Sequence, residues 1–385
     1  MRVSPKRNIK GSLRNLVLLI CCLIYAPIRG LAKRSTRKPK RICIIQMAHF
    51  GDMICTTPMF RAVKQTYPNA QLIVIGNAIN KQVLLGNPDI SEYIVWENKF
   101  RAFISKLHSL NLDFAVTTGP DFVGLAVLFL AGVPHIAVPR LEKGSSPLET
   151  KPYRLLCQLA YVVPHFFTSY VPREYLRLLE PIGIKTSDTR KYVYYSPEAL
   201  TSACQKLHLS LIGKRSFTII APGTGHKAKR WPAERFAAVA EYIVAQYMPV
   251  AVVGSESDAE VVENMMANIT HPDVINFGGN LSIEELKAFV SRASLFVSGD
   301  TGPIYIAEAL GIPTIDIVGP ASDTAQPPIG PKNIVLVPPR KKPTLEGFNT
   351  RIFDPIETKR QAEATTIEEV TKAVDVLIMK IRHSH

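Results

Sequence analysis

The stretch SLFVSGDTGPIYIAEALGIPTIDIVGP, residues 294–320, contains two apolar segments separated by a helical one. Residues 294–300 and 313–320 are short apolar runs, as expected of strands that are covered on both faces. Pro303 opens the helical segment, a position that proline favours. A strand, a helix and a second strand in this order predict parallel pairing within an α/β sheet.

The same alternation continues along the chain in two series. The first series has predicted strands at residues 41–47, 71–76, 92–96, 113–119 and 135–139, with helices at 54–68 and 121–131. The second has strands at 216–223, 249–254, 273–279, 294–300 and 313–320, with helices at 232–246, 257–268, 282–291 and 303–311. We therefore predict an α/β protein with two Rossmann-like, doubly wound sheets. We expect an extended loop and then a helix between residues 140 and 195, and a last helix over 365–383.

A chain of 385 residues exceeds one typical domain. We expect a basic and apolar N-terminal segment at 1–40 and a first domain at 41–195. A second domain follows at 196–345, and a tail with a helix at 346–385, which we consider packing back on the first domain.

The positive charge is concentrated at the N-terminus. Residues 1–41 contain twelve Lys or Arg and no acid, whereas the whole chain has a net charge of +14. This segment surrounds the apolar run LVLLICCLIYA, residues 16–26, so an anionic membrane surface is a better partner than nucleic acid. The run is too short to span a bilayer comfortably. We favour an interfacial helix or shallow anchor over a cleaved secretory signal, because the basic residues that follow it oppose export.

The six cysteines include no C-x-x-C pair. Free thiols in a reducing compartment explain them most simply, and their spacing does not assemble a zinc site.

Polar loops follow the predicted strands, at the edge where ligands bind in such sheets. In MAHFGDMICTTP, residues 47–58, Asp52 sits just before a predicted helix. It is either a helix N-cap or a general base that takes a proton from an attacking hydroxyl.

A second loop, APGTGHKAKRWPAERF, covers residues 221–236. Its glycines allow a ligand to approach the backbone closely. Its basic residues beside a helix start favour a diphosphate-binding loop over a basic loop that is merely exposed to solvent. The candidates are Thr224, Lys227 and Lys229. A third loop offers Glu256 as a weaker candidate for a ribose contact, although Glu256 or Asp258 could simply cap the next helix.

The fourth loop is the turn Asp300-Thr301-Gly302 of the opening stretch. Free backbone N–H groups at the following helix start form an anion site. We expect Asp300 to support the helix start, with Thr301 and Gly302 facing phosphate oxygens.

These loops resemble glycosyltransferase family 9, the heptosyltransferases of bacterial lipopolysaccharide synthesis. The resemblance covers most of residues 41–340 and rests on FGDMICTTPMFRAVKQTYPNAQLIVIG, PGTGHKAKRWPAERFAAVAEYI and SGDTGPIYIAEALGIPTIDIVGP. It implies a GT-B fold whose two domains face a cleft, the first binding the acceptor and the second the nucleotide-sugar. It also implies inverting transfer without a metal or other cofactor, from an ADP-sugar by family default.

Carried over by position, the resemblance makes Asp52 the general base, and Lys229 with Asp300, Thr301 and Gly302 the donor site. It implies a glycolipid or lipopolysaccharide acceptor. From the basic and apolar N-terminal segment we expect no nucleic acid partner and a peripheral or shallowly anchored location on the cytoplasmic face of the inner membrane.

The chain departs from the family pattern at Tyr305, where members commonly have histidine. Tyrosine can donate a hydrogen bond to phosphate but is uncharged near neutral pH, so Lys227 or His226 becomes a candidate for the missing charge. This departure motivates a second hypothesis, a non-catalytic nucleotide-sugar-binding or scaffold protein of an envelope glycan assembly. A GT-B-related sugar epimerase is a third, for which we find no additional acid or base.

Overall fold

The computed structural model describes residues 9–30, 38–143, 146–166, 169–210, 212, 215–345 and 354–383. The chain forms two compact units, which we describe separately. The first comprises Met1–Ala48, Pro58–Ala78 and Pro88–Thr189, and the second His49–Thr57, Ile79–Asn87 and Arg190–His385. The short segment His49–Thr57 therefore belongs to the second unit, although it directly follows the first strand in the chain.

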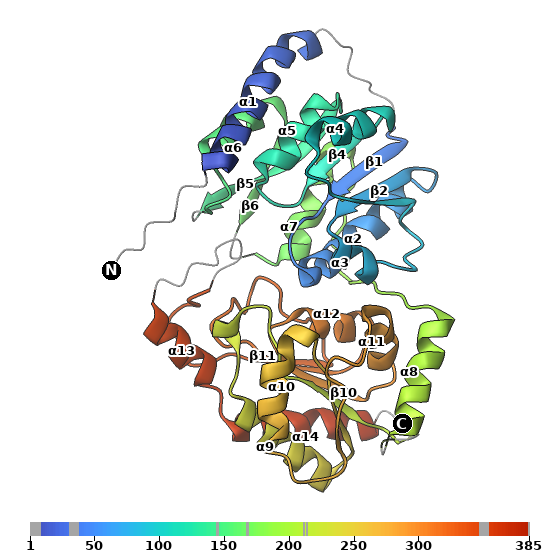
Figure 1. Ribbon diagram of the computed structural model, residues 1–385, viewed down its shortest axis with the longest axis vertical. Helices are drawn as coiled ribbons and strands as arrows, with labels where there is room; N and C mark the ends of the chain where they lie inside the picture. Colours follow the sequence, from blue (N-terminus) through green and yellow to red (C-terminus); the bar gives the residue numbers. More distant parts are fainter. Residues whose placement is uncertain are drawn as a thin grey trace. The chain divides into compact units, whose positions relative to one another are not determined.

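The first unit is built on a parallel sheet with the strand order β3-β2-β1-β4-β5-β6 (Figure 1). Its strands are β1 (Arg41–Ile45), β2 (Gln71–Gly76), β3 (Glu92–Val95), β4 (Phe114–Thr117), β5 (His135–Lys143) and β6 (Tyr161–Phe166). The helices of this half of the chain are α1 (Ile9–Gly30), α2 (Phe50–Thr66), α3 (Ala78–Val83), α4 (Phe100–Ser109), α5 (Phe122–Leu130), α6 (Lys151–Leu156) and α7 (Val171–Arg177). The strand order reverses between β1 and β4, which makes their carboxyl ends a favoured place for ligands.

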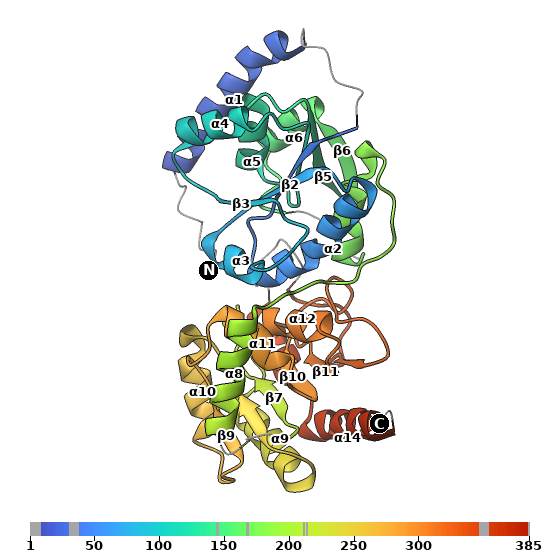
Figure 2. The ribbon, with the colours of Figure 1, turned by 90° about the vertical axis from the view of Figure 1, so that its right-hand side faces the viewer.

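Helix α1 is part of the core of the first unit. It packs against α5 and α6 (Figures 1 and 2). Leu18 and Cys22 are buried in the core, and the Tyr25 ring meets Phe129 of α5 edge-on with 6.0 Å between centroids. The apolar run that we singled out is thus helical and half covered by protein. The helices in the part of the chain that the structure describes include none that is long and apolar enough to cross a membrane.

The second unit has a parallel sheet with the order β12-β11-β10-β7-β8-β9. Its strands are β7 (Thr218–Ala221), β8 (Val250–Val252), β9 (Val274–Asn276), β10 (Leu295–Gly299), β11 (Thr314–Ile317) and β12 (Asn333–Leu336). The helices are α8 (Pro197–Leu209), α9 (Ala233–Gln246), α10 (Ala259–Met266), α11 (Ile283–Val290), α12 (Gly302–Ala309), α13 (Pro355–Glu363) and α14 (Ile367–His383), with short 3-10 turns at Lys227–Lys229 and Glu256–Asp258. Here the order reverses between β7 and β10.

Helix α14 closes one side of this second sheet. It packs against α9, and Val370, Val374 and Leu377 are buried in the same core as Val297 of β10. We expected the C-terminal tail to pack back on the first domain, whereas α14 is a core element of the second unit. Its apolar stripe explains the difference, because residues 370, 374 and 377 recur at helical spacing and cover the sheet.

Two strands were missed by the sequence analysis. β6 falls where we expected an extended loop, because Pro164 interrupts its apolar pattern. Proline is tolerated there because β6 pairs only with β5, at the edge of the sheet. β12 is also an edge strand and is only four residues long. Of the N-terminal basic segment, residues 1–8 and 31–37 lie outside the described residues.

Candidate active site

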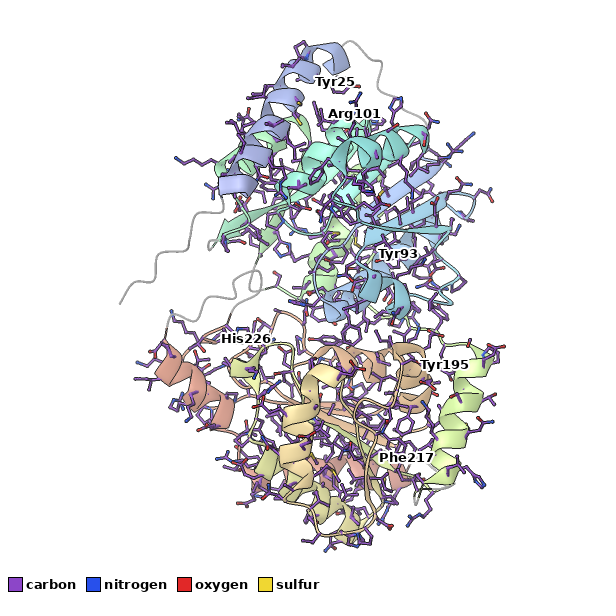
Figure 3. The ribbon with its side chains drawn as sticks, in the orientation of Figure 1. Tyr25, Tyr93, Arg101, Tyr195, Phe217 and His226 are labelled. Carbon is purple, nitrogen blue, oxygen red and sulfur yellow. The ribbon has the colours of Figure 1, made fainter. Side chains whose placement is uncertain are left out.

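Two loops of the second unit meet at the point where its strand order reverses. β7 and β10 are parallel neighbours, so the loops that follow them leave the same edge of the sheet. The loop after β7 carries Lys229, and the turn after β10 carries Asp300. The Lys229 Nζ lies 2.7 Å from the Asp300 carboxylate. His226, labelled in Figure 3, belongs to the same loop.

Asp300 is held by two donors. Lys229 donates to Oδ2, and the hydroxyl of Tyr305 donates to Oδ1 over 2.8 Å. The N-cap of α12 is Thr301, whose side chain makes no capping bond. Our expectation that Asp300 supports the helix start is therefore wrong, because both of its oxygens are occupied by Lys229 and Tyr305. The first backbone N–H groups of α12 are left without a side-chain cap, which favours an anion there.

Tyr305 is buried beneath this cluster. A Cβ added at Gly51 would lie 3.0 Å from the Tyr305 ring, so glycine allows the ring to pack on the backbone at the start of α2. Burial, reinforced by the Asp300 charge, raises the pKa of Tyr305 well above its ordinary value, and the ring stays neutral. The Lys191 Nζ lies 5.5 Å from the centroid of this ring and is paired with Glu308 at 2.7 Å.

Asp52 lies in the first turn of α2, which starts at Phe50, four residues before the predicted start at residue 54. Its Oδ2 accepts from the backbone N–H of His49, and its Oδ1 accepts from the Gln326 amide at 2.8 Å. Asp52 is therefore not the N-cap that one of our alternatives held: it lies inside the helix and accepts from the backbone N–H that precedes it. The carboxylate is also engaged by the loop after β11. Burial raises the pKa of Asp52, against the opposing effects of Gln326, His49 and Lys229.

Lys229 is the positive centre of the cluster. Burial disfavours its charge, but the Asp300 carboxylate, with smaller contributions from Asp52 and Asp316, raises the pKa of Lys229 overall. The lysine is therefore charged at neutral pH. Its side chain remains 27% exposed, which leaves it accessible to an anionic ligand.

The remaining predicted residues are distributed around this loop. Thr224 is buried and donates to the His226 carbonyl at 2.9 Å. Lys227 is directed to Glu260 at 3.0 Å, so the structure does not bring it to Tyr305. Ser255 is the N-cap of the 3-10 turn Glu256–Asp258, and Asp258 accepts from the Ser255 backbone N–H in a capping box. The Asp258 side chain makes no capping bond to α10, so it is not the helix cap that we considered. Glu256 is exposed.

Our sequence analysis missed three contributors. Gln326 follows the strand at 313–320 in a polar loop, and this position at the ligand-binding edge was its signal. Asp316 is a lone acid within the apolar strand β11, and burial and the Asp300 charge raise its pKa well above the ordinary value. Lys191 lay in a segment that we considered irregular. The described residues contain no group of three or more His, Cys, Asp or Glu side chains that could hold a metal ion.

A family model described as glycosyltransferase family 9 (heptosyltransferase) matches residues 128–350, more than half of the 385 residues. The chain belongs to glycosyltransferase family 9. It is a glycosyltransferase enzyme, as the resemblance predicted.

Curated relatives cover most of this family 9 chain. Lipooligosaccharide heptosyltransferase 2 of Haemophilus influenzae (strain Rd) is 24% identical over 342 residues, 81% of this chain and 95% of that protein. Lipopolysaccharide heptosyltransferase 2 of Escherichia coli K12 is 24% identical over 337 residues, 82% of this chain and 94% of that protein.

Solved structures confirm the fold of this family 9 glycosyltransferase. A family 9 glycosyltransferase from Veillonella parvula has a TM-score of 0.71 at 21% identity, covering 89% of this chain and 98% of that one. The E. coli ADP-heptose lipopolysaccharide heptosyltransferase II has a TM-score of 0.71 at 20% identity, with 88% and 99% covered. The prediction of two parallel α/β domains of the GT-B type is thereby confirmed.

Proposed function

We propose that this enzyme transfers a heptose from ADP-heptose to a lipopolysaccharide-type, lipid-linked acceptor, with inversion at the anomeric carbon and without a metal. The observation that carries the proposal is the presence of Asp52, Lys229 and Asp300 in one electrostatically coupled cluster. The names of the relatives, lipopolysaccharide heptosyltransferases and an ADP-heptose enzyme, support the donor and the acceptor class.

Asp52 is the proposed general base. Its carboxylate takes the proton of the acceptor hydroxyl while that oxygen bonds to the anomeric carbon of the sugar. The bond from this carbon to the diphosphate oxygen breaks on the opposite face, which inverts the configuration. Gln326 orients the carboxylate through its 2.8 Å hydrogen bond and leaves the other lone pairs of Oδ1 available.

The leaving ADP acquires negative charge as this bond breaks. Lys229 and the uncapped N–H groups of α12 at Thr301 and Gly302 are the proposed electrophilic partners for that charge. Tyr305 holds Asp300, which in turn holds Lys229, so we assign Tyr305 to positioning the lysine. Thr224, Lys227 and Glu256 remain candidates for further phosphate and ribose contacts.

The proposal keeps the predicted organisation of the chain. In this proposal residues 41–195 contribute mainly to acceptor binding and residues 196–345 to the donor, while α14 of the segment 346–385 belongs to the core of the second unit. The basic segment 1–41 attaches the enzyme peripherally to the anionic cytoplasmic face of the inner membrane, where a lipid-linked acceptor is located.

Asp52→Asn tests the proposal because it preserves shape and removes the base. Loss of general base catalysis lowers kcat by about 10²–10⁴-fold. Calorimetric binding of ADP should be retained, which controls for folding. Transfer at the wild-type rate in Asp52→Asn would contradict the base assignment. Nucleotide-sugar binding by the wild type without transfer to any lipopolysaccharide acceptor would instead support the scaffold hypothesis.

The donor is identified by a thermal-shift series with ADP-, GDP-, UDP- and dTDP-sugars. A ligand that binds the native state raises the melting temperature by mass action, so ADP-heptose should give the largest shift. A larger shift with another nucleotide would contradict the proposed donor.

A further inference from the structure

The run 16–26 of helix α1 contains no charged or strongly polar side chain, but protein covers only one side of it. The side that faces α5 and α6 carries Leu18, Cys22 and Tyr25. Six large apolar side chains point away from the unit and are 47–68% exposed: Leu13, Leu16, Val17, Ile20, Leu23 and Ile24. We refer to these six as the α1 stripe. An apolar helix face is normally buried, and among the residues that the structure describes no element covers this one.

The positions of the α1 stripe form one continuous surface. They are spaced by three, one, three, three and one residues along the chain. At 3.6 residues per turn these positions occupy an arc of about 120°, directly opposite the core-facing side. The α1 stripe is therefore a continuous apolar face like that of an amphipathic helix. The opposite side of α1, which would be polar in such a helix, packs on the protein core instead.

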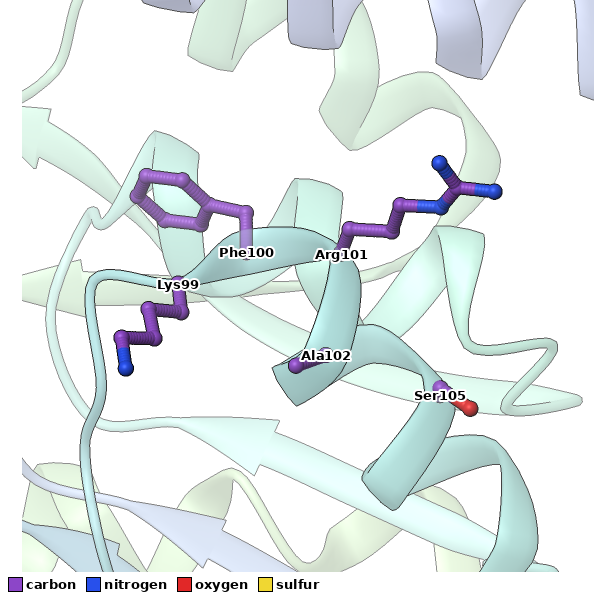
Figure 4. A pocket seen from close by; sticks show the side chains of 5 residues that line it. All are labelled: Lys99, Phe100, Arg101, Ala102 and Ser105. Atoms are coloured by element: carbon purple, nitrogen blue, oxygen red, sulfur yellow. The ribbon is translucent and has the colours of Figure 1, made fainter.

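The charges around α1 identify the partner. The segment 1–41 that contains the helix has twelve basic residues and no acid. The guanidinium of Arg14 lies 5.6 Å over the ring of Phe100, at the start of α4. Phe100 lines a surface depression together with Lys99 and Arg101, which are exposed (Figure 4).

From this arrangement we infer that α1 lies in the plane of an anionic membrane surface, with the α1 stripe inserted among the acyl chains near the lipid headgroups. Lys99 and Arg101 bind the phosphates of those headgroups, and the positive charge of the segment 1–41 adds electrostatic attraction to the anionic surface. A second copy of this chain is a poorer occupant, because two α1 stripes in contact would bring two strongly basic segments together. The inference extends the membrane attachment that we propose above.

The geometry has a definite consequence. Leu18, Cys22 and Tyr25 fix α1 to the core of the first unit. Insertion of the α1 stripe therefore holds the first unit directly against the lipid, whereas a flexible anchor would leave it free to move away. The helix cannot leave to span a bilayer without exposing the side chains that it covers on α5.

Vesicle binding tests the inference. The double variant Leu16→Glu/Ile20→Glu places charges in the stripe, and Ile356→Glu replaces an isoleucine outside the stripe that is 85% exposed on the polar helix α13. On phosphatidylethanolamine–phosphatidylglycerol vesicles at about 0.15 M salt, the double variant should bind at least tenfold more weakly than the wild type, and Ile356→Glu should bind equally well. Equal binding of all three proteins would overturn the inference in favour of electrostatic attachment alone.

If the double variant misfolds, a second measurement still tests the inference. Fluorescence of Ile20→Trp, after subtraction of the wild-type signal, should be quenched by brominated lipids, whereas that of Ile356→Trp should not. Absence of quenching, or a wild-type dimer in solution that the stripe variant makes monomeric, would overturn the inference.

An assay of heptose transfer to a delipidated acceptor in solution distinguishes the proposed enzyme activity from the proposed membrane insertion of α1. If transfer persists without vesicle binding, only the membrane inference fails. If vesicles bind and no transfer occurs, only the proposed function fails.

Discussion

At the scale of single residues, the position of Tyr305 explains how the site accommodates the loss of the histidine common in the family. The ring does not replace a positive charge. Its hydroxyl donates to Asp300, and its neutral ring packs against the backbone at Gly51. The positive charge in this region comes instead from Lys229 and Lys191, each paired with a carboxylate.

Tyr305→Phe should lower kcat/KM for the donor, because it removes the hydrogen bond to Asp300 while the ring packing is kept. Loss of a hydrogen bond to a carboxylate costs about 1.5 kcal/mol, so kcat/KM for the donor should fall about tenfold. Tyr93→Phe is the matched control, because it loses one hydrogen bond to the Asn77 carbonyl in the first unit. Steady-state measurement of kcat/KM for the donor tests this prediction. An unchanged kcat/KM in Tyr305→Phe would mean that Lys229 alone holds Asp300.

Gln326→Ala should change the pH dependence of the reaction. The Gln326 amide stabilises the Asp52 carboxylate and so lowers a pKa that burial raises. Its removal raises that pKa further, and the base is then protonated at higher pH. The acid limb of the profile of kcat/KM against pH should move to higher pH in Gln326→Ala and stay in place in the exposed control Gln246→Ala. A shift to lower pH would contradict the role of Gln326.

At the scale of elements, the start of α12 is packed against the start of α2 through a glycine. A Cβ added at Gly302 would lie within 1.7 Å of the Phe50 ring. The N-terminus of α12, with its uncapped N–H groups, and the first turn that carries Asp52 are thereby fixed to each other within the second unit.

Gly302→Ala should therefore destabilise the protein. The new methyl group must displace Phe50, and overpacking of this kind costs about 1–3 kcal/mol. Gly225→Ala is the control, because a Cβ there meets nothing within 4 Å. Thermal unfolding should give a lower melting temperature for Gly302→Ala only. Equal melting temperatures would indicate that Phe50 moves away at little cost.

The sequence analysis succeeded where elements are long and regularly patterned. The central strands of both sheets and the helices α9 to α12 and α14 were predicted within a few residues, because their apolar periodicity is unambiguous. Edge strand β6 was not, since a proline breaks its pattern. Lys229 was grouped with Asp300 only through the family resemblance, and the strand order that brings them together was not predicted from the sequence. The bond from Gln326 to Asp52 joins residues 274 positions apart and depends on loop geometry that no local pattern records.

At the scale of the whole molecule, stability also depends on ionisable groups of the first unit, which does not contain the site. His165 of β6 is 2% exposed, and burial, reinforced by Arg177, lowers its pKa from 6.5 to about 4. The unfolded chain binds this proton at higher pH than the folded chain does. The associated stability is complete above pH 6.5 and is lost as the pH falls towards 4.

His165→Gln should reduce this acid sensitivity. Between pH 7 and 4 the wild type should lose about 3 kcal/mol through this residue, and the variant should not. Melting temperatures across this range, with the exposed His208→Gln as control, measure the difference. Parallel curves for His165→Gln and the wild type would mean that the imidazole is protonated in the folded state.

The membership of His49–Thr57 in the second unit has a consequence for engineered hybrids. A chimera joined near residue 190, with halves from two enzymes of the family, would take Asp52 from one parent and its partner Gln326 from the other. Acceptor preference and catalytic competence would then be inherited together from the N-terminal parent. A hybrid intended to exchange only the acceptor should keep residues 49–57 and 79–87 from the parent that supplies the second unit.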